Sequence, residues 1–183
     1  ICEIDLRAPE SAVYQIGDTV LVAQLSRELV DWGHVVVPAG LARVTNVAGA
    51  SLRAEIITQF GRIADGLVAM PVDAFADPGG AVPVPVENGA MGEVIDARDI
   101  TQVPNHRDVV FINLGRSDGV VLGDVFEVLQ PIGQDEVSAA AEVRQVALMQ
   151  IVHVRENSSS GMLVNITDLG TAPGVPVRLV RKM

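Results

Sequence analysis

The chain is poor in cysteine, in aromatic residues and in positive charge. Its single cysteine, Cys2, excludes an intramolecular disulfide and any site built from several thiolates. Thirteen Lys and Arg stand against 23 Asp and Glu, a net charge of −10. Because a nucleic-acid-binding surface must neutralise phosphates, we expect no nucleic-acid partner. No apolar run approaches the ~20 residues of a membrane span, so we expect membrane association to be peripheral, through partners or a segment upstream of Ile1.

Three interpretations of Cys2 are open. It could be a lipid-modified cysteine left by signal cleavage, one half of an intermolecular bridge, or an ordinary small residue in a first strand. The third is favoured, because a lipid-modified cysteine would be the first residue and Ile1 precedes it.

The composition favours strands over helices. Apolar residues make up 49% of the chain but aromatic residues only 3%, so the core must consist mostly of Val, Ile, Leu and Ala. Seventeen Gly and ten Pro separate β-branched runs at short intervals, a pattern typical of many short strands. The sequence therefore predicts an all-β protein.

The clearest strand–turn–strand signal lies between residues 109 and 129. Residues 109–114 and 125–129 are β-branched and aromatic runs. Between them lie Asp118-Gly119 and Gly123-Asp124, residue pairs that suit turns with positive φ and a capping side chain. A similar pair, Gly17-Asp18, precedes the run 19–23. We expect fold-setting turns at Gly17, Asp18, Asp118, Gly119, Gly123 and Asp124.

The two halves of the chain match one another. The pair Gly17-Asp18 aligns with Gly123-Asp124 at an offset of 106 residues. Three further blocks follow in the same order at offsets of 107, 107 and 108: 41–47 with 148–154, 54–57 with 161–164, and 65–68 with 173–176. This internal repeat predicts two tandem small antiparallel β-barrel or sandwich domains. We expect them at residues 1–72 and 93–183, joined by a Pro/Gly-rich linker at 73–92.

Two stretches of the first half need interpretation. Residues 24–31 allow either a helical turn or a long hairpin arm, with Trp32 at its tip. Because exposed aromatics often anchor interfaces, Trp32 is a candidate partner contact, although it could equally pack over a barrel end. Residues 35–40 read as a strand ended by a turn at Pro38-Ala39-Gly40.

The sequence offers no convincing catalytic, metal or cofactor site. Gly115-Arg116-Ser117-Asp118-Gly119 has the spacing of a nucleophile elbow, but a strand follows where the elbow requires a helix. The three histidines lack metal-ligand spacing. We therefore expect no enzyme activity, no cofactor, no metal and no small-molecule substrate.

The motif at 111–120, followed by 123–128, resembles the C-terminal domain of flagellar assembly protein T. It also resembles the C-terminal β-region of bacterial envelope proteins that carry a LysM module, and this likeness extends to 14–22, 35–47 and 174–179. The resemblance implies a periplasmic β-domain that assembles on other proteins. No LysM module is visible, so peptidoglycan binding is not implied. The chain is also similar to membrane-extrinsic subunits that brace a bacterial photosynthetic reaction centre within its light-harvesting ring.

Two functions remain in different classes. The first is a structural scaffold subunit that docks on protein subunits of a larger extracytoplasmic, membrane-associated complex, and it predicts that 24–34 and 72–92 bind partners. The second is a cell-envelope module that binds glycan or peptide in a concave polar groove. A hydrolase using Ser117 or Ser158 is a weaker third.

Overall fold

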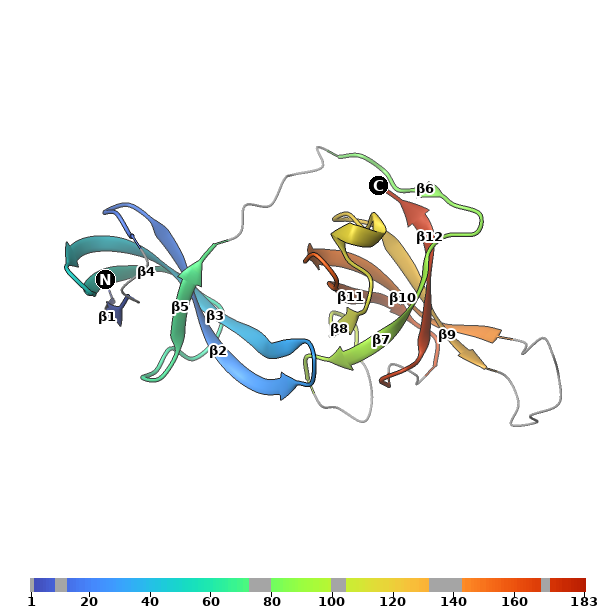
Figure 1. Ribbon diagram of the computed structural model, residues 1–183, viewed down its shortest axis with the longest axis horizontal. Coiled ribbons are helices and arrows are strands. Elements are labelled where there is room, and N and C mark those ends of the chain that lie inside the picture. Colours follow the sequence, from blue (N-terminus) through green and yellow to red (C-terminus); the bar gives the residue numbers. More distant parts are fainter. Residues whose placement is uncertain (1, 9–12, 73–79, 100–104, 132–142, 169–171) are drawn as a thin grey trace. The chain divides into compact units, whose positions relative to one another are not determined.

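The computed structural model describes residues 2–8, 13–72, 80–99, 105–131, 143–168 and 172–183. In these residues every regular element is a β-strand except η1 (Arg116–Asp118), a single turn of 3-10 helix. The predicted all-β class is confirmed. The chain divides into two compact units, unit 1 (Ile1–Phe75) and unit 2 (Ala76–Met183) (Figure 1).

Unit 1 is a five-stranded antiparallel sheet in the order β1-β4-β3-β2-β5. The strands are β1 (Glu3–Arg7), β2 (Thr19–Leu29), β3 (Gly33–Ala48), β4 (Ser51–Gln59) and β5 (Val68–Pro71). Side chains alternate between the two faces of a strand, and β1 shows this directly, because Ile4 and Leu6 are half-buried while its charged residues are exposed. The inward side chains of the sheet form a small core around Val20, Val22 and Val44.

Unit 2 contains a closed barrel. Its strands pair in the order β6-β12-β7-β8-β11-β10-β9, and β12 also pairs with β9, so six strands from β7 to β12 form a ring. The short strand β6 lies outside this ring, on β12. The bounds are β6 (Val84–Pro85), β7 (Met91–Ala97), β8 (Val109–Ile112), β9 (Val125–Pro131), β10 (Val143–Val154), β11 (Ser159–Ile166) and β12 (Pro176–Lys182).

The predicted internal repeat is confirmed for five strands of each unit. The order β1-β4-β3-β2-β5 of unit 1 matches β8-β11-β10-β9-β12 of unit 2. The register matches as well. Leu21 lies opposite Met70 in unit 1, and Glu127 lies opposite Arg178 in unit 2. Glu127 follows Leu21 by 106 residues and Arg178 follows Met70 by 108, which are offsets of the repeat. Unit 1 has no described strand equivalent to β7, so its sheet is an open counterpart of the barrel.

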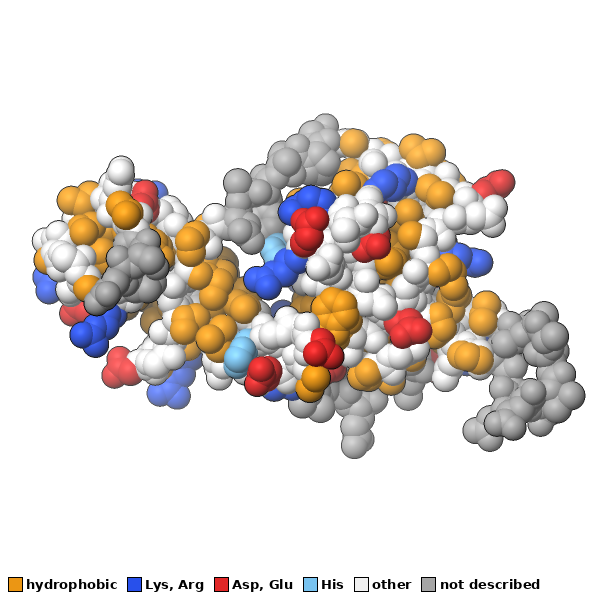
Figure 2. Space-filling model, in the orientation of Figure 1, with side chains coloured by type: hydrophobic (Ala, Val, Ile, Leu, Met, Phe, Trp, Pro, Cys, Tyr) orange, Lys and Arg blue, Asp and Glu red, His pale blue; other side chains and the backbone are white. Residues whose placement is uncertain are grey.

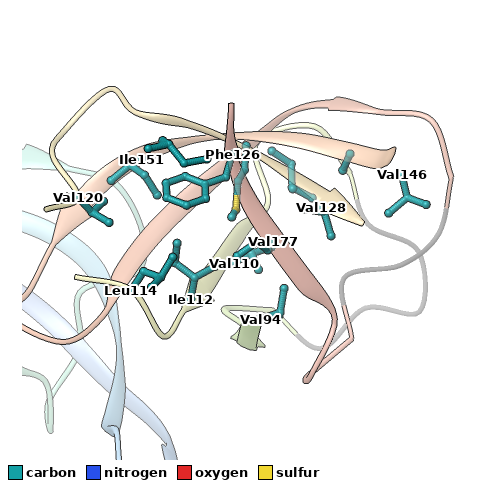
Figure 3. Close-up of a cluster of buried hydrophobic side chains, with 14 residues drawn as sticks. Val94, Val110, Ile112, Leu114, Val120, Phe126, Val128, Val146, Ile151 and Val177 are labelled. Carbon is teal, nitrogen blue, oxygen red and sulfur yellow. The ribbon is translucent and has the colours of Figure 1, made fainter. Parts of the chain in front are cut away.

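The core of unit 2 is the larger of the two. Figure 3 shows the ring of Phe126 pointing into a cluster of aliphatic side chains from the surrounding strands. At the equivalent position unit 1 has Val20. Side-chain sizes also compensate across neighbouring strands. In unit 2 the large Met149 lies beside Gly161, and a Cβ on Gly161 would lie 2.7 Å from the sulfur of Met149. Unit 1 has Ala42 and Ala54 at the two equivalent positions. The two cores are thus built from different sets of side-chain volumes at equivalent positions.

Residues 24–31 belong to a hairpin, which settles one ambiguous stretch. β2 and β3 continue past the rest of the sheet as a two-stranded arm (residues 24–37), visible as the paired blue strands of Figure 1. The predicted turn at residues 38–40 is wrong, because β3 runs straight through it. Pro38 lies beside a register shift at Val22/Ala23, and proline is tolerated in a sheet at such a bulge.

The expected linker is partly strand, which corrects a second interpretation. Val84–Pro85 forms β6 against the end of β12, and the amide of Val86 donates to the Val180 carbonyl at 3.0 Å. An edge strand tolerates proline because its outer side needs no amide donor. Residues 73–79 lie outside the described residues. In the part of the chain that the structure describes, no helix is long or apolar enough to cross a bilayer.

Candidate protein-binding surfaces

The Gly-Asp turns at residues 17–18 and 123–124 have the same geometry. Gly17 and Gly123 have φ of 100° and 87°, a region that glycine enters without a steric penalty. The Asp18 carboxylate accepts from the Gln15 amide at 2.8 Å, and Asp124 accepts from Val121 at 2.9 Å. Each turn then bonds to the neighbouring strand by the same two backbone hydrogen bonds. These residues set the fold.

The two aspartates differ in their surroundings. Asp18 is exposed, whereas the side chain of Asp124 is fully buried. Asp124 accepts hydrogen bonds from the ammonium of Lys182 at 2.7 Å and from the amide of Met183 at 2.9 Å. Lys182 also donates to the Gly119 carbonyl at 2.6 Å. The network therefore ties the end of β12 to both predicted turns of unit 2. The one feature of the sequence that could have drawn attention to this network is Lys182 itself, because it is the only lysine of the chain.

A second ion pair lies across β9 and β12. Glu127 is buried and its carboxylate accepts from Arg178 Nε at 2.6 Å, directly opposite in the register. In unit 1 the equivalent pair is Leu21 and Met70, both half-buried. The position that carries charge in the closed barrel is therefore apolar in the open sheet.

Asp118 and Gly119 end the short helix η1. The Asp118 carboxylate accepts from the Gly115 amide at 2.9 Å, and Gly119 follows with φ of 78°. The Ser117 hydroxyl donates to the Glu156 carbonyl at 2.9 Å. This places Ser117 in a turn-stabilising bond, with no histidine among its hydrogen-bond partners.

The other residues considered for chemistry are dispersed. Ser158 to Ser160 lie at the turn that opens β11, and Ser159 faces the barrel interior, where it is buried. Within the described ranges, no group of three His, Cys, Asp or Glu could hold a metal ion. A shallow hollow occurs in unit 1, lined by Asp5, Leu6, Arg7, Ala48, Ala50 and Ser51.

Trp32 lies at the tip of the arm. The turn there contains Asp31 and Gly33, both with positive φ, and Trp32 itself is 40% exposed beside the still more exposed Val30. Its amide donates to the Leu29 carbonyl at 3.0 Å, which closes the hairpin turn. The arm therefore presents two large apolar side chains at its end.

Unit 1 exposes several large apolar side chains. Figure 2 shows hydrophobic side chains gathered on unit 1 over the place where β2, β3 and β5 meet in Figure 1. In the register, Leu21 stands between Leu41 and Met70, and all three are half-buried. Nine described residues of unit 1 are large, apolar and exposed: Val13, Ile16, Leu25, Val30, Trp32, Val47, Ile57, Phe60 and Val72.

A further candidate surface is the open edge of unit 1, which we define as the outer edges of β1 and β5. Among the residues that the structure describes, β1 pairs with β4 alone and β5 with β2 alone. In unit 2 the equivalent edges both pair with β7. Free backbone donors and acceptors at such an edge can pair with another chain.

Comparison with known protein families, with curated proteins and with solved structures gave no match for this chain. The resemblances to LysM-linked envelope proteins, to flagellar assembly protein T and to reaction-centre subunits therefore stay predictions. The function has to be argued from the surfaces themselves.

Proposed function

We propose that the chain is a non-enzymatic scaffold subunit that docks on a larger extracytoplasmic, membrane-associated protein complex. The observation that carries the proposal is the surface of unit 1, which combines exposed apolar side chains, a projecting arm and an open sheet edge. Contiguous apolar surface on a soluble protein marks an interaction site more often than it occurs by chance.

The two units suit different tasks in such a subunit. Unit 2 is a closed barrel with a continuous core, and ion pairs join its last strand to buried carboxylates, so it suits the role of a stable support. Unit 1 offers Trp32 at the end of an arm, and an aromatic at an exposed tip is a typical interface anchor. A net charge of −10 keeps the unassembled chain soluble despite its apolar surface.

The sequence resemblance suggests which complex to examine first. Membrane-extrinsic subunits that brace a photosynthetic reaction centre within its light-harvesting ring must bind proteins from outside the membrane. A chain with two β-units and an apolar docking face fits that requirement, and this complex is our first candidate for the partner.

Purification of the full chain from native membranes, with identification of the co-migrating proteins, tests the proposal. We expect defined membrane-protein subunits to co-migrate with the wild-type chain and to be lost from a Trp32→Ala variant. A Val121→Ala variant, which removes a similarly exposed residue from unit 2, is the matched control and should retain them. A solitary, monodisperse monomer in native extracts would contradict the proposal.

The hollow beside β1 supports the second candidate, an envelope module for glycan or peptide. Its lining brings Asp5 and Arg7 next to Ser51, a polar set that could hydrogen-bond such a ligand. Titration of the chain with peptidoglycan fragments, followed by amide NMR shifts, distinguishes the two. Shifts that are confined to residues of the hollow and are removed by Arg7→Ala would favour the envelope module. Unchanged spectra would exclude ligand binding at the hollow and favour the scaffold function.

A further inference from the structure

Residues 87–89 form a bulge along one edge of β12. β12 pairs with β9 along one edge, and along the other edge it pairs with β7 and then with β6. From Pro85 to Met91 the chain advances six residues, while the residues of β12 that face them, Arg181 and Arg178, lie three apart. Residues 87–89 are therefore extra residues that loop out between β6 and β7.

The backbone of the bulge favours asparagine at one position and requires glycine at the next. Asn88 has φ of 57°, in the left-handed region that asparagine enters more readily than most side chains. Gly89 packs directly on β12, where a Cβ would overlap the carbonyl oxygen of Leu179. The fold of this edge therefore selects the sequence Asn88-Gly89.

An asparagine that precedes a glycine is chemically labile. Asparagine is among the residues that limit the lifetime of proteins at high temperature. The backbone nitrogen of the following residue can attack the side-chain amide carbon, and a glycine, which has no Cβ, leaves the approach to that nitrogen open. The chain has six asparagines, and Asn88 is the only one that precedes a glycine.

Both reactive groups of this pair are available. Asn88 is exposed, and within the described residues neither its side chain nor the amide of Gly89 makes a hydrogen bond. The pair Asp118-Gly119 is a contrast. The Asp118 carboxylate accepts a backbone amide at 2.9 Å, and the Gly119 amide donates to a backbone carbonyl at 3.0 Å. Hydrogen bonds hold the equivalent groups there, whereas those of Asn88-Gly89 can approach one another.

We propose that Asn88 is a site of spontaneous deamidation, and that the isoaspartate product releases β6 from β12. The Gly89 nitrogen forms a bond to Cγ of Asn88, the bond from Cγ to Nδ2 breaks, and the side-chain nitrogen leaves as ammonia with the proton of the Gly89 amide. Water then opens the cyclic imide at either carbonyl, which gives aspartate or isoaspartate. The inference goes beyond the proposed docking function and does not rest on it.

Isoaspartate lengthens the main chain of the bulge, because the Cβ of residue 88 becomes a backbone atom. At one end of the bulge the Ala90 carbonyl accepts from Leu179 at 2.9 Å, and β7 beyond it is also held by β8. At the other end the Val86 amide donates to the Val180 carbonyl at 3.0 Å, and β6 beyond it pairs through two exposed residues with β12 alone. The shift should therefore be taken up by β6.

Incubation of the full chain at mildly alkaline pH tests the modification. Peptide mass spectrometry should show the amide of Asn88 converted to a carboxyl group, with release of ammonia and gain of one negative charge. The rate should rise with pH, because the attacking Gly89 amide must lose its proton. Asn157, which precedes a serine, is the internal control and should convert far more slowly. Asn88→Gly fits the same left-handed backbone and is the matched control, which should gain no charge.

Hydrogen exchange of the Val86 amide tests the release of β6. Exchange at Val86 should be faster in the purified isoaspartate form than in the fresh chain. An Asn88→Asp variant carries the new charge without the longer main chain, and it should keep the slow exchange of the fresh chain. This pair separates the effect of the backbone from the effect of the charge.

Three results would overturn the inference. One is an unchanged Asn88 under conditions that convert a synthetic peptide of residues 84–92, because the fold would then protect the pair. Another is conversion of Asn157 as fast as that of Asn88. The third is an unchanged exchange rate at Val86 in the purified isoaspartate form, which would show that β6 stays in place.

Discussion

Unit 1 and unit 2 share one five-stranded plan and differ in whether it closes. Both have the same strand order, the same register and the same bonds at the Gly-Asp turn. Unit 2 adds β7 and becomes a ring, and it encloses a larger cluster of buried residues than unit 1 does. Local turn chemistry therefore specifies the sheet, while closure depends on a single additional strand.

The second difference lies in side chains at equivalent positions. In unit 2 the buried Asp124 pairs with Lys182, and Glu127 pairs across strands with Arg178; neither pair has a counterpart among the described residues of unit 1. Where unit 2 uses charge to fasten β12 to the barrel, unit 1 has apolar residues that stay partly exposed. The closed unit is stabilised from within, and the open unit leaves apolar side chains partly exposed, which suits the proposed docking function.

Replacing Phe126 should give the largest separation between the units. Phe126→Ala removes the central ring of the barrel core and should lower the free energy of unfolding of unit 2 by about 4 kcal/mol. The equivalent Val20→Ala removes two methyl groups and should cost unit 1 about 2 kcal/mol. Chemical denaturation followed by assigned amide signals of each unit measures both. Equal costs would show that the two cores are packed alike.

Asp124→Ala and Asp18→Ala form a matched pair of smaller effect. The first leaves the amides of Val121 and Met183 and the ammonium of Lys182 without their buried acceptor, and it should cost unit 2 about 3 kcal/mol. The second removes one exposed turn bond and should cost unit 1 about 1 kcal/mol. Both variants are read by the same denaturation experiment. A cost for Asp18→Ala as large as that for Asp124→Ala would mean that the turn bond, and not the buried network, dominates.

A double-mutant cycle on Glu127 and Arg178 should show a coupling of up to about 1 kcal/mol that shrinks as salt is added. The equivalent cycle on Leu21 and Met70 should show coupling that does not weaken with salt, because neither residue is charged. Thermal unfolding at low and high ionic strength gives both values. Identical salt dependence in the two cycles would refute the contrast.

Trp32→Ala should have the smallest effect on folding. The side chain lies at the end of the arm and away from the core of unit 1, so unfolding should change by less than about 0.5 kcal/mol. Its effect should appear in association, as loss of co-migrating membrane proteins. A large loss of stability would indicate that Trp32 packs against unit 1 instead of serving a partner.

The repeat was readable from the sequence because its signals are local. In each turn the glycine adopts a positive φ and the carboxylate of the next aspartate accepts a backbone hydrogen bond, so Gly17-Asp18 and Gly123-Asp124 predict the same turn. The same reliance on local signals misread Pro38-Ala39-Gly40 as a turn. There the pairing of β3 with strands on both sides outweighed the two turn-forming residues.

Closure and burial could not be read in this way. Asp18 and Asp124 sit in similar local sequences, and they differ because Lys182 reaches Asp124 from 58 residues away. The ring of unit 2 likewise depends on β7 pairing with β12, across most of the unit. Such contacts are fixed by the tertiary fold, so the open edge of unit 1 became visible only when the two units were compared.

Amide hydrogen exchange of the free chain at low concentration tests the central claim most directly. The amides to compare are those of Arg7 and Asn113, which are equivalent in the repeat. Asn113 donates to the Glu93 carbonyl of β7, whereas Arg7 directs its amide to the open edge. The account predicts slow exchange at Asn113 and fast exchange at Arg7. Equal, strong protection of both amides would contradict it, because unit 1 would then already be closed.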